Sequence, residues 1–341
     1  MSTQPFLTPQ SEIAGAIAVA LNIYALSAGA DFGGGVWDLF AIGPRRDRQR
    51  ELIANAIAPI WEANHVWLIL VVVLLFTAFP PAFSRLMTLL HIPLTLMLLG
   101  IVLRGSAFTF RSYDSQRDRV QRRWGRIFAI ASILTPLLLG VILGAIATGK
   151  LSAARLSNPA SFAEVYVQPW LAPFPIGVGA LALVLFALLA AVYLTVEAKD
   201  AALREDFRRR ALWAGTAVAV VAAMNLYLAR AHAPLVWSEL TEGSLAMGFR
   251  IGAAISALGA MASLWLRRFR WARVAAAIEV SLILWGWALG QYPYLVPPDL
   301  TVDNSAAPPA TLRLLAIALV AGLALLLPSL RYLFKVFKEG Y

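Results

Sequence analysis

Nine long apolar segments, separated by short charged clusters, constrain the fold of this chain more than any other feature. A helix needs about 20 apolar residues to cross a bilayer. Apolar residues make up 60% of the 341 positions and charged residues 14%, against about 45–50% and about 25% in soluble domains. The sequence predicts an all-α polytopic membrane protein that forms one integral membrane domain over residues 1–341. The predicted spans are 11–32, 56–79, 84–104, 127–148, 172–196, 211–230, 247–266, 271–290 and 311–333.

The distribution of Lys and Arg predicts the orientation of these spans. Most of the 29 basic residues lie in alternate loops and at the C-terminal end, and such loops face the cytoplasm. The N-terminus is therefore expected outside and the C-terminus in the cytoplasm, which requires an odd number of spans. No basic residue precedes the first span, which reads as a retained helix. The loops expected in the cytoplasm are 38–50, 104–126, 197–210 and 267–273.

Several function classes are excluded by what the chain lacks. There is no Cys, so disulfides, iron–sulfur clusters and thiolate metal sites are ruled out. The chain has neither a Walker A loop nor a dinucleotide fingerprint, which argues against ATP-driven chemistry. The net charge of +10 is explained by the loop arginines, and no nucleic-acid partner is expected. The loops 150–171 and 291–310 are too short for an independent domain.

Two stretches place acids in predicted spans. Glu62 and His65 are three residues apart and share a helix face, and a charge at the bilayer centre costs at least about 2.5 kcal/mol. This pair indicates proton conduction, or a neutral Glu62 that bonds Asn64 or a neighbouring helix. Asp31 stands beside glycines that include Gly33 and Gly35. It either caps the first span or forms a polar site with the second.

Haem ligation and interfacial anchoring are the other readings of the polar residues in the spans. His65 and His91 could ligate a haem as a facing pair, but no polar side chains near His91 in the sequence support its ring, so we expect no haem on this chain. Arg104 is expected to snorkel at the membrane interface. Trp61 and most other tryptophans lie near span ends, as is ordinary for membrane proteins.

Six motifs in order resemble subunit II of the cytochrome bd-type quinol oxidases. The resemblance covers nearly the whole chain and also agrees with nine spans and an outside N-terminus. The motifs are residues 29–35 (GADFGGG), 55–68 (NAIAPIWEANHVWL), 104–111 (RGSAFTFR), 193–195 (YLT), 290–294 (GQYPY) and 328–333 (PSLRYL).

The resemblance implies a heterodimer in a bacterial cytoplasmic (inner) membrane. A haem-bearing subunit I would carry haem b and haem d, oxidise quinol and reduce oxygen to water. This chain would carry no haem or metal and no catalytic residue, and would form two four-helix bundles plus one helix. It would support the haem site and supply part of a cytoplasmic proton channel. Small single-span subunits, a structural quinone and the identity of the quinone stay open.

The resemblance also assigns roles to single residues. Asp31 and Glu62 fall on the family's acidic positions, with His65 and Thr109 completing the expected proton path. Ala28 and Thr109 depart from the family, because some members carry acids near these positions. A purely structural membrane subunit and a secondary transporter therefore remain alternatives. Structural or interface roles are expected for Trp61, Asn64, Arg104, Gly33 and Gly35.

Overall fold

The structure, a computed structural model, describes residues 8–57, 61–113, 118–153 and 161–338. Within these ranges, eight helices are long and apolar enough to cross a membrane, or nine if the bent pair α3 and α4 forms one span. The chain is therefore an all-α polytopic membrane protein, apart from one short hairpin. The long helices are α1 (Pro9–Leu39), α3 (Trp61–Ala78), α5 (His91–Tyr113), α6 (Asp118–Ala147), α9 (Pro173–Glu197), α10 (Ala201–His232), α12 (Ser244–Trp265), α13 (Phe269–Gln291) and α14 (Pro309–Lys338).

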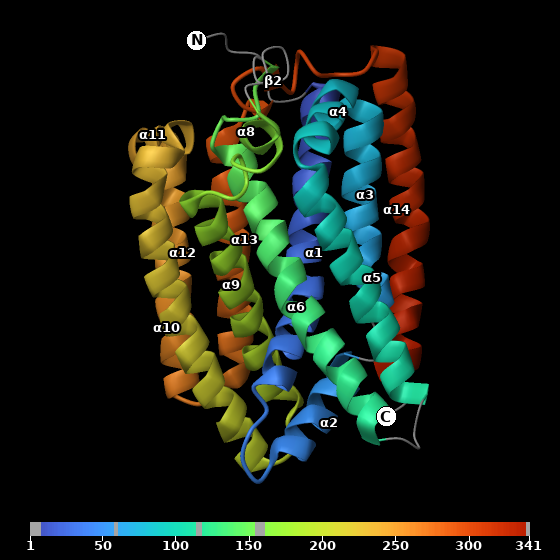
Figure 1. Ribbon diagram of the computed structural model, residues 1–341, viewed down its shortest axis with the longest axis vertical. Coiled ribbons are helices and arrows are strands. Elements are labelled where there is room, and N and C mark those ends of the chain that lie inside the picture. The colour runs from blue at the N-terminus through green and yellow to red at the C-terminus, as the bar shows by residue number, and fades with distance from the viewer. Residues whose placement is uncertain (1–7, 58–60, 114–117, 154–160, 339–341) are drawn as a thin grey trace.

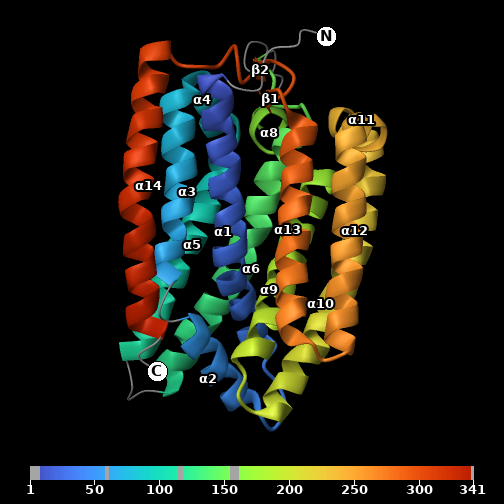
Figure 2. The same cartoon turned by 180° about the vertical axis from the view of Figure 1, so that it is seen from behind.

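The long helices stand side by side, with α1, α6 and α9 at the centre (Figures 1 and 2). Helix α1 contacts α3, α6 and α9, whereas α9 also contacts α10 and α13. Helix α14 lies at one edge against α1 and α3. Helix α1 begins at the end of the molecule that we call the N-terminal end, and α14 finishes at the opposite, C-terminal end.

Short elements complete the two ends. Helix α2 (Arg46–Ile57) lies at the C-terminal end, and α4 (Pro80–Leu89) and α8 (Phe162–Tyr166) lie at the N-terminal end (Figure 1). Helix α11 (Pro234–Glu242) joins α10 to α12. The strands β1 (Tyr294–Val296) and β2 (Leu300–Thr301) pair antiparallel. Arg85 of α4 anchors this hairpin, because its Nη1 donates to Asp299 Oδ2 between the two strands at 3.2 Å. The same nitrogen donates to the Leu151 carbonyl after α6 at 3.0 Å.

Glycines set the distance between α1 and the central helices. A Cβ added at Gly33 would lie 1.9 Å from the Phe186 carbonyl oxygen of α9, and one at Gly35 would lie 2.2 Å from Ser132 Oγ of α6. Membrane helices approach closely where small residues face each other, since no hydrophobic force drives their association in lipid. Gly33 and Gly35 therefore serve packing within the chain.

Helix boundaries depart from the sequence expectation in three places. Asp31 does not cap or end the first span, because α1 continues for two more turns to Leu39. The predicted span 84–104 is broken, since α4 is bent by 118° from α3 and α5 begins only at His91. Prolines begin α4, and Pro cannot supply the amide that would continue the preceding helix. The predicted loop 38–50 contains the start of α2.

Some of the expected boundaries fall outside the described residues. These are 58–60 within the second predicted span, 114–117 within one predicted cytoplasmic loop, and 154–160 within one predicted outer loop.

Candidate functional site

A buried carboxylate on α1 begins the candidate site. Asp31 is 8% exposed and accepts a hydrogen bond from Asn64 Nδ2 in the first turn of α3. Because α1 rises about 1.5 Å per residue, Asp31 lies roughly 10 Å from the middle of this helix. The apolar half-thickness of a bilayer is about 15 Å, so a centred α1 would keep Asp31 inside the membrane.

Arg104 of α5 brings a positive charge to the same place. The side chain is 2% exposed, and its guanidinium carbon lies 4.7 Å from the Phe32 ring centroid and 5.2 Å from that of Phe128. Its Nε donates to Ser132 Oγ at 3.3 Å, and it interacts electrostatically with Asp31. Two aromatic faces stabilise a desolvated cation. The expectation that Arg104 snorkels is therefore wrong, because α5 runs on for more than two turns and keeps Arg104 in the interior.

His65 and Tyr24 extend this cluster along α1. The half-buried His65 ring lies with its centroid 5.9 Å from that of Tyr24 and 6.2 Å from that of Phe32. Tyr24 is 1% exposed, stands two turns before Asp31 on the same helix face, and interacts electrostatically with Arg104 and Asp31. We call Tyr24, Asp31, Asn64, His65 and Arg104 the α1 cluster. Tyr24 was not predicted from the sequence. Its position seven residues before Asp31 places it on the same face of a helix and could have indicated its role.

Glu62 and Thr109 lie outside the α1 cluster. Glu62, the second residue of α3, is exposed, whereas Asn64 two positions later is buried. No hydrogen bond or ion pair of Glu62 occurs in the described part of the chain. Thr109 is exposed and its hydroxyl donates to the Gly105 carbonyl of its own helix at 3.1 Å. The side chain of Trp61 lies outside the described residues. The structure therefore brings together Asp31, Asn64, His65 and Arg104, and leaves Glu62 and Thr109 on the surface.

The two histidines considered for haem ligation lie far apart along the long axis of the molecule. His65 is in the first turns of α3, and His91 is the first residue of α5 at the N-terminal end (Figure 1). His91 is exposed, and its Nδ1 lies 2.9 Å from the Thr88 carbonyl. One haem cannot reach both rings. In the described residues, no group of three or more His, Asp or Glu side chains is arranged to hold a metal ion.

A second buried acid was missed by sequence reasoning. Glu279 of α13 is 3% exposed, near the middle of a helix that passes α1 and α9. In the described part of the chain, no hydrogen bond or ion pair of Glu279 is found. The sequence could have indicated this residue, because Glu279 is an acid within the predicted span 271–290.

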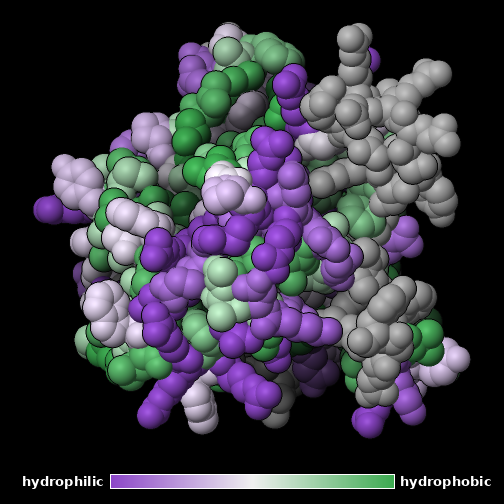
Figure 3. Space-filling view, turned by 90° about the horizontal axis from the view of Figure 1, so that it is seen from below, coloured by the Kyte–Doolittle hydropathy of each residue, from purple (hydrophilic) through white to green (hydrophobic). Residues whose placement is uncertain are grey.

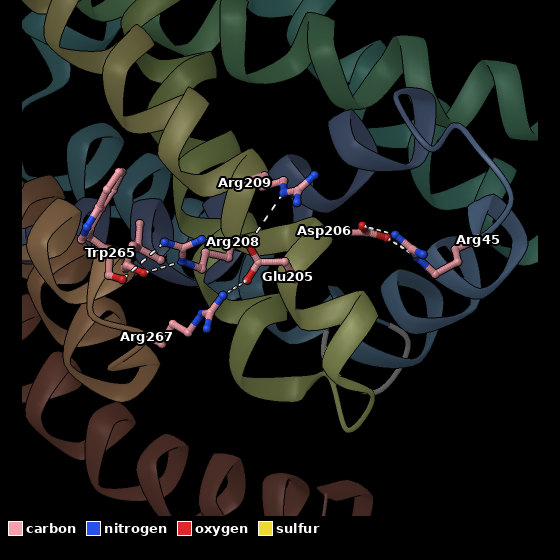
Figure 4. A network of polar contacts seen from close by, with 8 residues as sticks. Arg45, Glu205, Asp206, Arg208, Arg209, Trp265 and Arg267 are labelled. Atoms are coloured by element: carbon pink, nitrogen blue, oxygen red, sulfur yellow. Dashed lines mark hydrogen bonds and ion pairs between the residues drawn. The ribbon is translucent and has the colours of Figure 1, made fainter.

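Ion pairs join three segments at the C-terminal end (Figure 4). Arg45, after α1, bonds Asp206 of α10 through two contacts of 2.6 and 2.8 Å. Glu205 of α10 accepts from Arg208 at 2.8 Å and pairs with Arg267 at 3.5 Å in the turn between α12 and α13. Figure 3 shows this end, where hydrophilic residues cross much of the face. We call these contacts the ion-pair network.

Asp200, the N-cap of α10, belongs to the same network. Its Oδ1 accepts from the Ala202 amide at 2.6 Å, and its other oxygen pairs with Arg48. The backbone hydrogen bond first, and Arg48 second, hold the pKa of Asp200 below its usual value. The hydrogen bond to Asp206 likewise raises the pKa of Arg45.

Comparison with known proteins decides the family. The sequence pattern of the family described as "Cytochrome bd terminal oxidase subunit II" matches residues 10–337. The chain belongs to this family. Subunit II of Bacillus subtilis (strain 168), named "Putative cytochrome bd menaquinol oxidase subunit II", is 26% identical over 325 residues, which cover 92% of this chain and 91% of that one.

Two further likenesses agree with this assignment. Cytochrome bd-I ubiquinol oxidase subunit 2 of Escherichia coli (strain K12) is 34% identical over 134 residues, covering 39% of this subunit II and 34% of that protein. A chain of the bd oxidase from Geobacillus thermodenitrificans superposes with a TM-score of 0.74 at 21% identity, over 97% of this chain and 99% of that one. That superposition shows that the two chains share a fold.

Proposed function

We propose that this chain is the haem-free subunit II of a bacterial bd-type quinol oxidase and that it delivers cytoplasmic protons towards the oxygen-reduction site. In this proposal, subunit I holds haem b and haem d, oxidises quinol and reduces oxygen to water. The observation that carries the proton role is the α1 cluster, in which a buried acid, amide and guanidinium lie with the half-buried imidazole of His65, three residues along α3 from the exposed Glu62. Ionisable groups inside a membrane region commonly mark proton or ion pathways.

The orientation of the chain follows from its charged end. We place the C-terminal end in the cytoplasm, because the ion-pair network and most of the basic loops lie there and basic loops face the cytoplasm. The N-terminus then lies outside, across nine spans. As the family resemblance implies, we assign α1, α3, α5 and α6 to one four-helix bundle and α9, α10, α12 and α13 to a second, with α14 added; contacts of α9 with α1 and α6 join the two. The membrane is the bacterial inner membrane.

The exposure of Glu62 indicates where the route leaves this chain. Asn64 bonds Asp31, so the first turn of α3 lies at the depth of Asp31, inside the bilayer by the estimate above. A carboxylate that faced lipid at that depth would cost at least about 2.5 kcal/mol. We therefore infer that subunit I or a water-filled route covers the face of α3 that carries Glu62.

The proposed route runs from the cytoplasmic end past Asp31 and His65 to Glu62. Arg104 stabilises the charge on Asp31, and imidazole and carboxyl groups exchange protons through intervening waters. Thr109 can orient a water at the surface but carries no proton charge. Oxygen reduction consumes protons, so uptake from the cytoplasm makes turnover electrogenic.

A purely structural role is the second candidate, and one observation favours it. Asp31 already has the Asn64 amide and the charge of Arg104 nearby, which is what a buried acid needs to hold helices together. The secondary-transporter alternative has no such support. Pro136 lies within the continuous helix α6 and Pro175 in the first turn of α9, so neither breaks a span at its middle as transporter sites require.

Glu62→Gln in the assembled oxidase separates the two candidates. The change keeps size and hydrogen bonding but removes titration, so we expect quinol oxidase turnover to fall at least about tenfold, which is about 1.4 kcal/mol of barrier, at normal haem content. Asp31→Asn should have a smaller effect. Glu51→Gln, at an exposed position on α2, is the matched control. Wild-type turnover by a fully assembled Glu62→Gln enzyme would show that the acid is structural.

A further inference from the structure

A groove of about 350 Å³ runs along α13 near the C-terminal end. Arg273 of α13 and Tyr193 of α9 lie at one end of it, and Val274, Ile278 and Leu282 line its length. These three apolar positions recur every fourth residue, so they form one stripe along the helix. At about 1.5 Å per residue, the groove extends roughly 13 Å from Arg273 towards the middle of the membrane. No acidic side chain lines it.

The cation at the end of the groove is not neutralised within the described part of the chain. Arg273 is exposed, and its guanidinium carbon lies 5.7 Å from the Tyr193 ring centroid. It forms no ion pair with any described acid. The neighbouring Arg267, in contrast, pairs with Glu205. Arg268 and Arg270 are exposed close by, so the start of α13 carries an excess of positive charge.

One end of the groove is cationic and the rest is apolar, which matches the charged headgroup and the acyl chain of an anionic phospholipid. Trp271 is 67% exposed beside Arg273, and exposed tryptophans mark the headgroup level of a bilayer. A guanidinium there donates well to a phosphodiester, whereas the stripe beyond it offers only apolar surface apart from Ser281. A zwitterionic headgroup would bring its own cation towards the arginines. A free phosphate ion would leave the apolar stripe unused.

We propose that this groove binds an anionic phospholipid, with the phosphate at Arg273 and Tyr193 and one acyl chain along Val274, Ile278 and Leu282. The headgroup then sits in the leaflet at the C-terminal end, and the chain covers apolar surface of α13. None of these residues belongs to the proposed proton route. The lipid site therefore stands or falls independently of that route.

The test measures lipid retention by the detergent-purified complex of this chain with its partner. Native mass spectrometry would count phosphatidylglycerol and phosphatidylcholine bound at equal concentrations in mixed micelles. We expect wild type to retain phosphatidylglycerol preferentially, and Arg273→Gln to weaken it about fivefold, the change that one basic residue contributes near an anionic surface. Arg331→Gln, at an exposed position on α14 and outside the groove lining, is the control and should stay near wild type.

Two further arms keep the result decisive. Ala277→Phe fills the groove while leaving Arg273 in place, so it should also displace phosphatidylglycerol. Inorganic phosphate should not compete with the lipid at millimolar concentration. Equal phosphatidylglycerol binding by wild type, Arg273→Gln and Ala277→Phe would overturn the proposal. Equal retention of phosphatidylcholine and phosphatidylglycerol by wild type would overturn it as well, as would efficient competition by phosphate.

Discussion

The two halves of the molecule bury their acids in opposite ways. Among α1, α3, α5 and α6, Asp31 lies beside an amide and the Arg104 guanidinium, which is itself enclosed by two aromatic rings. Among α9, α10, α12 and α13, Glu279 is 3% exposed and no described cation pairs with it. The buried Asn225 of that half donates to the Gly177 carbonyl at 2.8 Å.

This difference indicates which half can hold charge. A buried carboxylate without a counter-charge costs far more than a neutral carboxyl group, so the second half accommodates Glu279 most easily in its protonated form. The first half supplies a guanidinium and hydrogen-bond donors, and can hold a charged carboxylate. The two groups of helices therefore differ in their capacity to hold charge, and the proposed proton route lies in the first half for this reason.

Removing Arg104 should produce the largest effect. Arg104→Leu would leave the Asp31 charge buried without its cation, which costs about 3–5 kcal/mol when a buried pair is broken. We expect poor assembly and a large loss of thermal stability. The double variant Arg104→Leu with Asp31→Asn should recover a substantial part of that stability, as measured by thermal unfolding of the complex. Equal stabilities of the single and double variants would show that the two residues are not coupled.

A substitution at Gly33 should rank next, because it tests the junction between the two halves. Gly33→Ala would push a methyl group against the Phe186 carbonyl of α9, and overpacking costs about 1–3 kcal/mol. Gly15, on the same helix, has nothing within 4 Å of an added Cβ. Gly15→Ala is therefore the matched control, and should be neutral or stabilising by about 0.5–1 kcal/mol. Thermal unfolding of both variants in one detergent measures the difference, and equal midpoints would contradict the close helix contact.

Glu279→Gln sharpens the comparison of the acids. The amide resembles a neutral carboxyl group in size and polarity, so we expect stability to change by less than about 1 kcal/mol and turnover to stay near wild type. Glu62→Gln should slow turnover about tenfold under the same conditions. Oxygen consumption by the two variants, at matched haem content, measures the contrast. A slow Glu279→Gln enzyme would move the proton route into the second half.

Hydropathy predicted an all-α membrane protein, because the length and lack of charge of an apolar segment are properties of that segment alone. It did not predict that α5 begins only at His91, inside the predicted span 84–104. It could not predict the burial of Arg104, which depends on how far α5 extends and on rings supplied by α1 and α6. The sequence also did not indicate that α1 continues beyond Asp31. The glycines beside Asp31 are packed against α6 and α9, and tertiary contacts outweigh local propensity there.

The sequence predicted part of the candidate site, namely the residues whose polarity alone sets them apart. Asp31, Asn64 and His65 stood out as polar residues in apolar segments, whereas their relative directions required the register of α3 against α1. That register turns Asn64 inward and Glu62 outward. The spacing of Glu62 and His65 along the helix did not indicate that one would be exposed and the other half-buried. Tyr24 escaped notice because tyrosine is common in membrane spans, and only contacts give it a role.

The smallest effect is expected at the surface, where Asp200 contrasts with the buried Asp31. Its pKa in the folded protein lies below the ordinary value of 3.8, first because of the Ala202 amide and then because of Arg48. A lowered folded-state pKa means that the ionised carboxylate stabilises the fold above about pH 4, and that this contribution disappears as the pH falls through the folded-state pKa.

Asp200→Asn keeps an N-cap but removes the charge. We therefore expect a slightly lower melting temperature at pH 7 and a shallower loss of stability on acidification towards pH 3. Asp47 is exposed on α2 and pairs, among the residues that the structure describes, only with its neighbour Arg46, so Asp47→Asn provides the control variant. Melting curves between pH 3 and pH 7 that are parallel for wild type and Asp200→Asn would show that water screens the Arg48 pair completely, as it does many exposed ion pairs.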